Sequence, residues 1–187
     1  MNLVFLSTAL AAQTNSHTDS PGKSQNNFGL YAGFGPNYYF NNLVLAKQFV
    51  NEFNYSISAS IMWEPEHRLS LGLETGFYRL YTVRISDPDI NITNDAIPIS
   101  LVVCMRILRN IYFKFASGQT ILLNKVTSSD FGKIKASTVS LGDFSGSLEY
   151  RKQLNDRFSL GSEMKFYYAS KLDDKNIAFI FLLGYHF

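Results

Sequence analysis

Beyond residue 28, apolar residues recur at every second position of the chain, which is the period of a β-strand and not of a helix. The clearest alternation spans residues 53–64. One face of this segment carries Phe53, Tyr55, Ile57, Ala59, Ile61 and Trp63, and the other carries Asn54, Ser56, Ser58, Ser60, Met62 and Glu64. Segments of the same type predict strands at residues 28–36, 53–64, 69–82, 96–108, 111–123, 141–151, 158–169 and 176–187.

The connections between these strands alternate between long and short. The sequence predicts tight turns at residues 64–68, 108–110 and 152–157, and longer polar loops near residues 37–52, 83–95, 124–140 and 170–175. An up-and-down meander that keeps both termini at its short-turn rim has this order and needs an even number of strands. The pattern therefore predicts an all-β, eight-stranded antiparallel up-and-down barrel over residues 28–187.

Side-chain size indicates which face of the barrel lies inside. Large apolar residues such as Leu71, Leu73 and Leu101 share one face, whereas glycine, serine and a few charged residues share the other. An eight-stranded barrel has an interior just wide enough for side chains, so the large apolar face belongs outside, against lipid. This favours a transmembrane β-barrel of the bacterial outer membrane, in contact with membrane lipid and lipopolysaccharide. A soluble lipocalin-like barrel, the alternative, would have a polar exterior and an apolar cavity.

Aromatic residues cluster near both ends of the predicted strands. Two such rings are typical of the lipid–water interfaces of outer-membrane barrels, although aromatic side chains also favour strands in general. The predicted girdle consists of Phe53, Tyr55, Phe77, Phe166 and Tyr168 towards the long loops, and of Trp63, Tyr150 and Phe158 towards the short turns.

The composition agrees with a membrane barrel. Of the 187 residues, 46% are hydrophobic and only 17% are charged, against about 25% charged residues in an average soluble protein. The chain is too apolar to be disordered, and no uninterrupted apolar run reaches the roughly 18 residues of a transmembrane helix. A formal net charge of +2 is too small for nonspecific attraction to phosphate, so nucleic acid is not an expected partner.

The N-terminal residues differ in character from the barrel. Residues 1–12 hold a short apolar run with a small-x-small cleavage site at residues 9–11, and we interpret them as a signal-peptide remnant without a positively charged start. The alternative is the frayed N-terminus of a cytosolic protein. Residues 13–27 are polar and rich in Ser and Asn, which predicts a flexible lead-in.

The sequence offers little catalytic or metal-binding chemistry. The three histidines are His17 in the lead-in, His67 in a short turn and His186 beside the last residue. None is expected at the long-loop rim, so neither an outward Ser/His/Asp arrangement nor a His/Cys metal site can be assembled there. We predict no enzyme, no metal and no cofactor, with carboxylate-only chemistry as the remaining alternative. Cys104, the single cysteine, is expected to be a buried, inert thiol.

Charged residues on the inward face form the most distinctive polar set. We expect them to pair as a salt-bridge plug, because buried charges need partners and eight strands leave no room for an open channel. A proton or ion path through the lumen is the alternative. The predicted lumen network consists of Glu74, Arg106, Lys114, Glu149, Glu163 and Lys165.

Further charges lie in the predicted long loops. Asp87, Asp89 and Asp95 fall in one of these loops, where carboxylate oxygens suit a weak calcium site. Residues Lys125, Lys133 and Lys135 fall in the next long loop. We expect these loop charges to be solvated or to form cross-loop pairs of little energetic value.

The last predicted strand, residues 176–187, ends on a phenylalanine. Its apolar residues alternate with the lipid-facing parity of the barrel. This ending resembles the C-terminal insertion signal of bacterial outer-membrane proteins, which implies the barrel-assembly machinery as a partner during insertion. The residues of this predicted signal are Phe179, Phe181, Leu183, Tyr185 and Phe187.

Two internal segments also resemble a known kind of barrel. Residues 96–101, AIPISL, resemble the entry to a middle strand, and residues 148–161 resemble a sixth strand, a turn and a seventh strand, in small PorT-like or OmpX-like outer-membrane barrels of Bacteroidota. The resemblance covers residues 28–187 and implies a fold more than a function.

The expected function follows from these features. We predict a non-enzymatic outer-membrane β-barrel with a plugged lumen and a structural or adhesive role, or a subunit of an envelope complex with other envelope proteins. The resemblance to PorT-like barrels makes a link to secretion the specific form of that expectation. The alternatives are a transporter or binder of small hydrophobic molecules with a lateral opening in its wall, and the soluble ligand-binding barrel.

Overall fold

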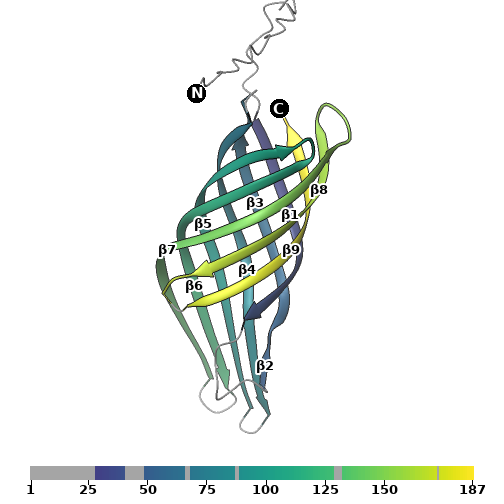
Figure 1. Ribbon diagram of the computed structural model, residues 1–187. Helices are drawn as coiled ribbons and strands as arrows, with labels where there is room; N and C mark the ends of the chain where they lie inside the picture. The colour runs from purple at the N-terminus through teal and green to yellow at the C-terminus, as the bar shows by residue number, and fades with distance from the viewer. Residues whose placement is uncertain (1–27, 41–48, 66–67, 87–88, 129–131, 172) are drawn as a thin grey trace, which may run out of the picture.

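The computed structural model describes residues 28–40, 49–65, 68–86, 89–128, 132–171 and 173–187 (Figure 1). The predicted signal-peptide remnant, residues 1–12, and the lead-in, residues 13–27, lie outside the described residues, as do His17 and His67. Within the described part of the chain, no helix is long and apolar enough to cross a membrane.

The described chain is built of antiparallel strands that close into a ring. Strands β1, β3, β4, β5, β6, β7, β8 and β9 follow one another round this ring, and the pairing of β1 with β9 closes it. The short strand β2 adds a further pairing to the far part of β4. The bounds are β1 (Phe28–Phe40), β2 (Val50–Asn51), β3 (Phe53–Trp63), β4 (Leu69–Ser86), β5 (Asp89–Leu108), β6 (Ile111–Ser128), β7 (Gly132–Gln153), β8 (Phe158–Ala169) and β9 (Asp174–His186).

The eight predicted strands and their up-and-down order are confirmed, but two predicted loops are wrong. Residues 83–95 and 124–140 are mostly strand in their described parts, because β4 and β5 stay paired as far as Ser86 and Asp89, and β6 and β7 as far as Ser128 and Gly132. Figure 1 shows both hairpins extending from the end of the barrel opposite the termini. Their polar composition suggested loops, yet paired strands outside a membrane satisfy their backbone groups with polar side chains on both faces.

One glycine allows β7 to change register. Gly142 has a φ of 74°, in the left-handed region that favours glycine. The pairing of β6 with β7 shifts at this point, since Gly118 pairs with Asp143 but Gln119 pairs with Leu141. Gly142 is thus the extra residue of a β-bulge, and it keeps the apolar side chains on one face of β7 above and below it.

The two faces of the barrel differ as the side-chain sizes predict. Large apolar side chains cover the outside, with Phe34 69% and Leu101 70% exposed. Serine, glycine and charged residues fill most of the inside together with a few aromatic rings. The soluble lipocalin-like alternative is therefore wrong, because a band of large apolar side chains around a closed barrel needs lipid as its solvent.

Candidate functional site: the lumen network

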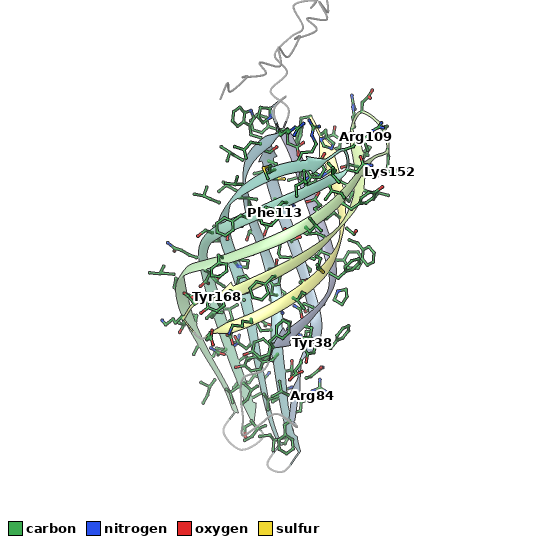
Figure 2. The ribbon with its side chains drawn as sticks, in the orientation of Figure 1. Tyr38, Arg84, Arg109, Phe113, Lys152 and Tyr168 are labelled. Carbon is green, nitrogen blue, oxygen red and sulfur yellow. The ribbon has the colours of Figure 1, made fainter. Side chains whose placement is uncertain are left out.

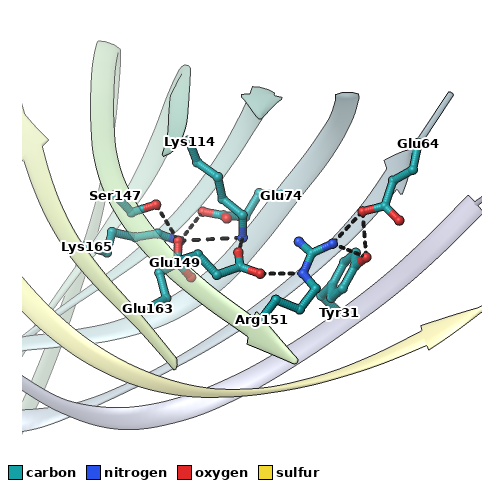
Figure 3. A network of polar contacts seen from close by, with 9 residues as sticks. All are labelled: Tyr31, Glu64, Glu74, Lys114, Ser147, Glu149, Arg151, Glu163 and Lys165. Carbon is teal, nitrogen blue, oxygen red and sulfur yellow. Dashed lines mark hydrogen bonds and ion pairs between the residues drawn. The ribbon is translucent and has the colours of Figure 1, made fainter. Parts of the chain in front are cut away.

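The lumen near the termini holds a compact group of buried charges (Figure 3). Lys114 and Lys165 lie in one inward row, on either side of Ser147. The next inward row places Glu149 directly opposite Glu163. Two facing carboxylates repel each other, and the lysines offset this repulsion.

The contacts within this group are close and shared. The ammonium of Lys114 contacts the carboxylate of Glu149 and lies 3.7 Å from Oε1 of Glu163. Nζ of Lys165 lies 3.3 Å from the same Glu163 oxygen, and the hydroxyl of Ser147 donates to it at 2.5 Å. All four charged side chains are buried, with 3% or less of each exposed. A buried carboxylate held by two cations and a hydroxyl has the compensation that burial of a charge requires.

Two further ion pairs connect opposite walls of the barrel. Nζ of Lys165, on β8, donates to Oε1 of Glu74, on β4, at 2.7 Å. Nη1 of Arg151, on β7, donates to Oε1 of Glu64, which follows β3, at 2.6 Å. Strands β4 and β8 are separated by three strands in either direction round the ring, and so are β3 and β7. Both pairs therefore run across the full width of the lumen.

Arg151 is the centre of this network on the side of the termini. Its Nε donates to Oε1 of Glu149 at 2.6 Å, and its Nη1 also donates to the hydroxyl of Tyr31. That hydroxyl donates in turn to Glu64 at 2.6 Å. The guanidinium lies 3.9 Å from the centroid of the Tyr31 ring and 4.5 Å from that of Tyr112, a geometry that adds cation–π attraction.

A layer of aromatic and aliphatic side chains fills the lumen on the other side of the charges. Tyr78 of β4 and Tyr167 of β8 stack with ring centroids 5.4 Å apart and an interplanar angle of 11°. The hydroxyl of Tyr167 donates to Oγ1 of Thr120 at 2.7 Å. Leu80 and Leu122 are fully buried in the same cluster. The rings of opposite walls meet here, as the ion pairs do nearer the termini.

The structure corrects one member of the predicted network. Arg106 is exposed and forms no ion pair with any residue for which the structure gives a position. The pairing of β5 with β6 shifts between Arg106 and Leu108, beside the turn, so the strand ends at an open rim where the side chain reaches water. The other five predicted residues, Glu74, Lys114, Glu149, Glu163 and Lys165, lie together in the lumen.

Sequence reasoning left Tyr31, Glu64 and Arg151 out of the predicted network. Arg151 has the inward parity of Glu149, two residues before it, and Glu64 continues the inward face of residues 54–62. Parity could therefore have identified both charged residues. Tyr31 could not be found in this way, because an inward tyrosine gives no sign of its partner on another strand.

The rim near the termini also brings a serine, a histidine and a glutamate together. Nε2 of His186 lies 3.2 Å from Oγ of Ser159, and its Nδ1 lies 3.4 Å from Oε2 of Glu64. This order of groups is that of a hydrolase triad. Ser159 is, however, only 1% exposed, and Glu64 is already bound by Arg151 and Tyr31. A substrate carbonyl cannot reach this serine, so we assign the three residues to the network.

The predicted girdle and insertion-signal residues lie on the outer face. Phe77, Tyr168 and Tyr185 are half-buried, and Phe187 follows the end of β9, where its N–H donates to the carbonyl of Phe28 at 3.0 Å. Whether the C-terminal residues direct insertion stays a prediction. The exposed girdle residues are Phe53, Tyr55, Trp63, Tyr150, Phe158 and Phe166. The exposed residues of the predicted insertion signal are Phe179, Phe181, Leu183 and Phe187.

Metal-binding groups are scarce in the described part of the chain. Among those residues, no cluster of three or more His, Cys, Asp or Glu side chains is arranged to hold a metal ion. Cys104 is buried beside Val102 and Ala116. Asp95, a member of the predicted acidic loop, lies on β5 and pairs with Arg79, whose Nε is 2.9 Å from Oδ1.

Comparison with solved structures identifies the fold. Ail, the attachment invasion locus protein of Yersinia pestis, solved in complex with the heparin analogue sucrose octasulfate, is similar with a TM-score of 0.60 and 14% identity, over 86% of this chain and 98% of Ail. Neisserial surface protein A is similar with a TM-score of 0.52 and 12% identity, over 86% and 97% of the two chains. The N-terminal β-barrel domain of Pseudomonas aeruginosa OprF is similar with a TM-score of 0.51 and 13% identity, over 87% of this chain and 98% of that domain.

At these identities the likeness concerns the fold. No protein-family model matches the chain, and a search of curated proteins finds no match. The fold is that of small bacterial outer-membrane barrels, and the exposed apolar band supplies the surface that such a barrel turns to lipid. Both observations place this chain in the outer membrane.

Proposed function

We propose that the chain is a non-enzymatic outer-membrane barrel with a plugged lumen, which serves as a structural or adhesive element of the envelope or as a subunit of an envelope complex. The observation that carries this proposal is the set of charged bonds between opposite walls, Glu74 to Lys165 and Glu64 to Arg151. An ion or solute that crossed the barrel would have to break them, and each broken pair leaves a buried charge at a cost of about 3–5 kcal/mol.

The second layer supports the same proposal. The stacked rings of Tyr78 and Tyr167 lie in the path of any solute that passes the charges. An eight-stranded barrel has an interior that side chains can fill. With its interior filled, the barrel acts through its surfaces: the lipid-facing wall, the rim near the termini and the two extended hairpins.

Conductance across a planar bilayer tests the plug. We expect the purified chain, refolded in detergent and inserted at the density of a control porin, to give no stable unit conductance. A variant with one side chain shortened in each layer, Lys165→Ala with Tyr167→Ala, breaks the Glu74 ion pair and the tyrosine stack, and it is expected to conduct more than the unaltered chain. Stable conductance steps from the unaltered chain would contradict the proposal.

The outer side offers the surfaces for the adhesive or complex-forming role. Hairpins β4–β5 and β6–β7 extend from the end of the barrel opposite the termini (Figure 1). A structural neighbour of this fold is named for attachment and invasion. The resemblance of residues 96–101 and 148–161 to PorT-like barrels of Bacteroidota makes a secretion-linked complex the specific form of the second role. The barrel-assembly machinery and other envelope proteins are the partners that this proposal includes.

A hollow in the outer wall favours the competing role of a carrier for small hydrophobic molecules. This hollow has a volume of about 210 Å³ and lies at the β1–β9 seam, where Pro36, Tyr38 and Phe179 line it. Behind it, Ala178 and Ile180 belong to the packed cluster of the lumen. The outer wall has a hollow, but the interior behind it is filled with side chains. The role of a plugged barrel is therefore better supported than that of a carrier.

A further inference from the structure

The outer face of the β6–β7 hairpin places two lysines side by side where the apolar band ends. Lys125 of β6 pairs directly with Lys135 of β7, and both side chains are exposed. Like charges at directly opposed positions of a strand pair destabilise it. This register therefore costs free energy unless an anion lies between the two ammonium groups.

The protein itself supplies no such anion in the parts that the structure describes. The carboxylate that lines the same hollow of about 270 Å³ as Lys125 and Lys135 is that of Asp95. Asp95 is already bound by Arg79 at 2.9 Å. A third cation lies further along β7, where the ammonium of Lys171 donates to the carbonyl of Val139, four residues from Lys135, at 3.3 Å.

A larger, mainly apolar hollow adjoins this basic site on the lipid side. It has a volume of about 490 Å³, within the usual range for ligand sites of about 300–1,000 Å³. The edge of the apolar hollow is formed by the cross-strand pair Ile121 and Val139. The next outward-facing pair along the hairpin, Leu123 and Ser137, lines the basic hollow, so the two hollows are adjacent. The small side chain of Ser117 opens its floor.

Gln119 places an amide that needs hydrogen-bond partners inside the apolar hollow. Its side chain faces outward between Ile99 and Leu141, and its amide has no hydrogen-bond partner among the residues with described positions. An unpaired amide that faces hydrocarbon is costly. An acyl chain that carries an amide or hydroxyl group near its headgroup can satisfy both the donor and the acceptor of Gln119, whereas a plain ester-linked chain offers acceptors only.

We infer that this face is a binding site for a phosphorylated glycolipid of the outer leaflet, the lipid A part of lipopolysaccharide, with a phosphate between Lys125 and Lys135 and an acyl chain in the hollow below. The long-loop end of such a barrel faces the outside of the cell, so the site lies at the level of the outer-leaflet headgroups. The inference goes beyond the proposed function and needs only the position of the barrel in the outer membrane.

Lipid binding by the refolded full chain in detergent micelles tests the inference, with bound lipids counted by native mass spectrometry. The test variant is Lys125→Gln with Lys135→Gln. The matched control, Arg109→Gln with Lys152→Gln, removes the same charge at the rim with the termini, where both side chains are exposed (Figure 2). A cation at an anionic lipid surface contributes about 1 kcal/mol, which is about fivefold in affinity, so we expect the test variant to bind diphosphorylated lipid A about 25-fold more weakly. The control is expected to bind as the unaltered chain does.

Three comparisons separate the source of the phosphate. Dephosphorylated lipid A should bind the unaltered chain as weakly as intact lipid A binds the test variant. Phosphatidylglycerol should bind more weakly than lipid A. The Gln119→Leu substitution should remove this preference for lipid A, while the affinity for lipid should still depend on Lys125 and Lys135. Millimolar inorganic phosphate should not displace lipid A.

Several results would overturn the inference. These are equal binding by the test variant and the unaltered chain, an equal loss in the control variant, equal affinity for phosphatidylglycerol, or full displacement by inorganic phosphate. A heat-dependent shift in gel migration verifies that every variant is folded. The conductance measurement does not involve this face, so the two proposals can fail separately.

Discussion

The pair Lys165–Glu74 gives the most direct test of how the lumen network stabilises the barrel. Lys165 is 2% exposed, and its ammonium lies 2.7 Å from Glu74 and 3.3 Å from Glu163. The substitution Lys165→Met keeps an unbranched apolar chain in place and removes the charge. Glu163 then still has Lys114 and Ser147, but Glu74 is left without a cation among the residues whose positions are described.

The expected cost follows from this asymmetry. Removal of one partner of a buried ion pair costs about 3–5 kcal/mol. We therefore expect Lys165→Met to lower the free energy of unfolding by about 3–5 kcal/mol at pH 7, because Glu74 is left as a buried carboxylate without its cation.

The reverse substitution should cost less. Glu74→Gln leaves Lys165 with Glu163, so we expect a loss of about 1.5–3 kcal/mol, the value of one hydrogen bond to a charged group. The double variant, Lys165→Met with Glu74→Gln, has no stranded carboxylate at position 74. Its loss should be smaller than that of Lys165→Met alone, so the coupling between the two positions should exceed the loss of Glu74→Gln and be at least about 1.5 kcal/mol.

Urea unfolding in lipid vesicles measures these differences. Trp63 is the single tryptophan, lies on the outer face and is 43% exposed, so its emission reports the loss of lipid contact on unfolding. Gel migration before and after heating gives an independent measure of the folded fraction. A loss below about 0.5 kcal/mol for Lys165→Met, the range of ordinary surface changes, would refute the reasoning, as would additive losses in the double variant.

Two further predictions concern the backbone and assembly. Gly142→Ala should destabilise the barrel by about 1–2 kcal/mol, because its φ of 74° disfavours any residue with a side chain. A Cβ at this position meets nothing within 4 Å, so the cost is one of backbone conformation alone. Gly146→Ala, where a Cβ is equally free and φ is not positive, should be nearly neutral in the same urea assay. Phe187→Ala should lower the membrane-inserted fraction in cell fractionation more than Ile134→Ala, which truncates a comparably exposed residue of the β6–β7 hairpin; equal insertion would show that Phe187 is only a girdle residue.

The sequence contains enough information for the fold and for most of the network. Alternation of apolar and small residues determines the strands, and side-chain size determines which face meets lipid. The same parity places Lys114, Glu149, Glu163 and Lys165 inside. These features are local, and each depends on residues next to one another in the chain.

Features that depend on register could not be predicted. The pairing of Glu74 with Lys165 spans 91 residues and depends on which strands face each other across the ring. The exposure of Arg106 depends on how far β5 continues before the rim, which parity does not report. The extension of β4 to β7 past the predicted strand ends could not be predicted, because polar residues on both faces suit a loop and a solvated hairpin equally.

The placement of charge in this barrel separates its two surfaces. Inside, each described cation of the network lies on two carboxylates, so the charges satisfy one another and hold opposite walls together. On the outer face of the β6–β7 hairpin, Lys125 and Lys135 meet each other without a described acidic partner. Charges that are already paired stabilise the fold and are not available to bind a ligand. Cations that the strand register holds side by side attract an anionic ligand. The interior therefore anchors the barrel, and the hairpin wall is where we propose that it binds lipid.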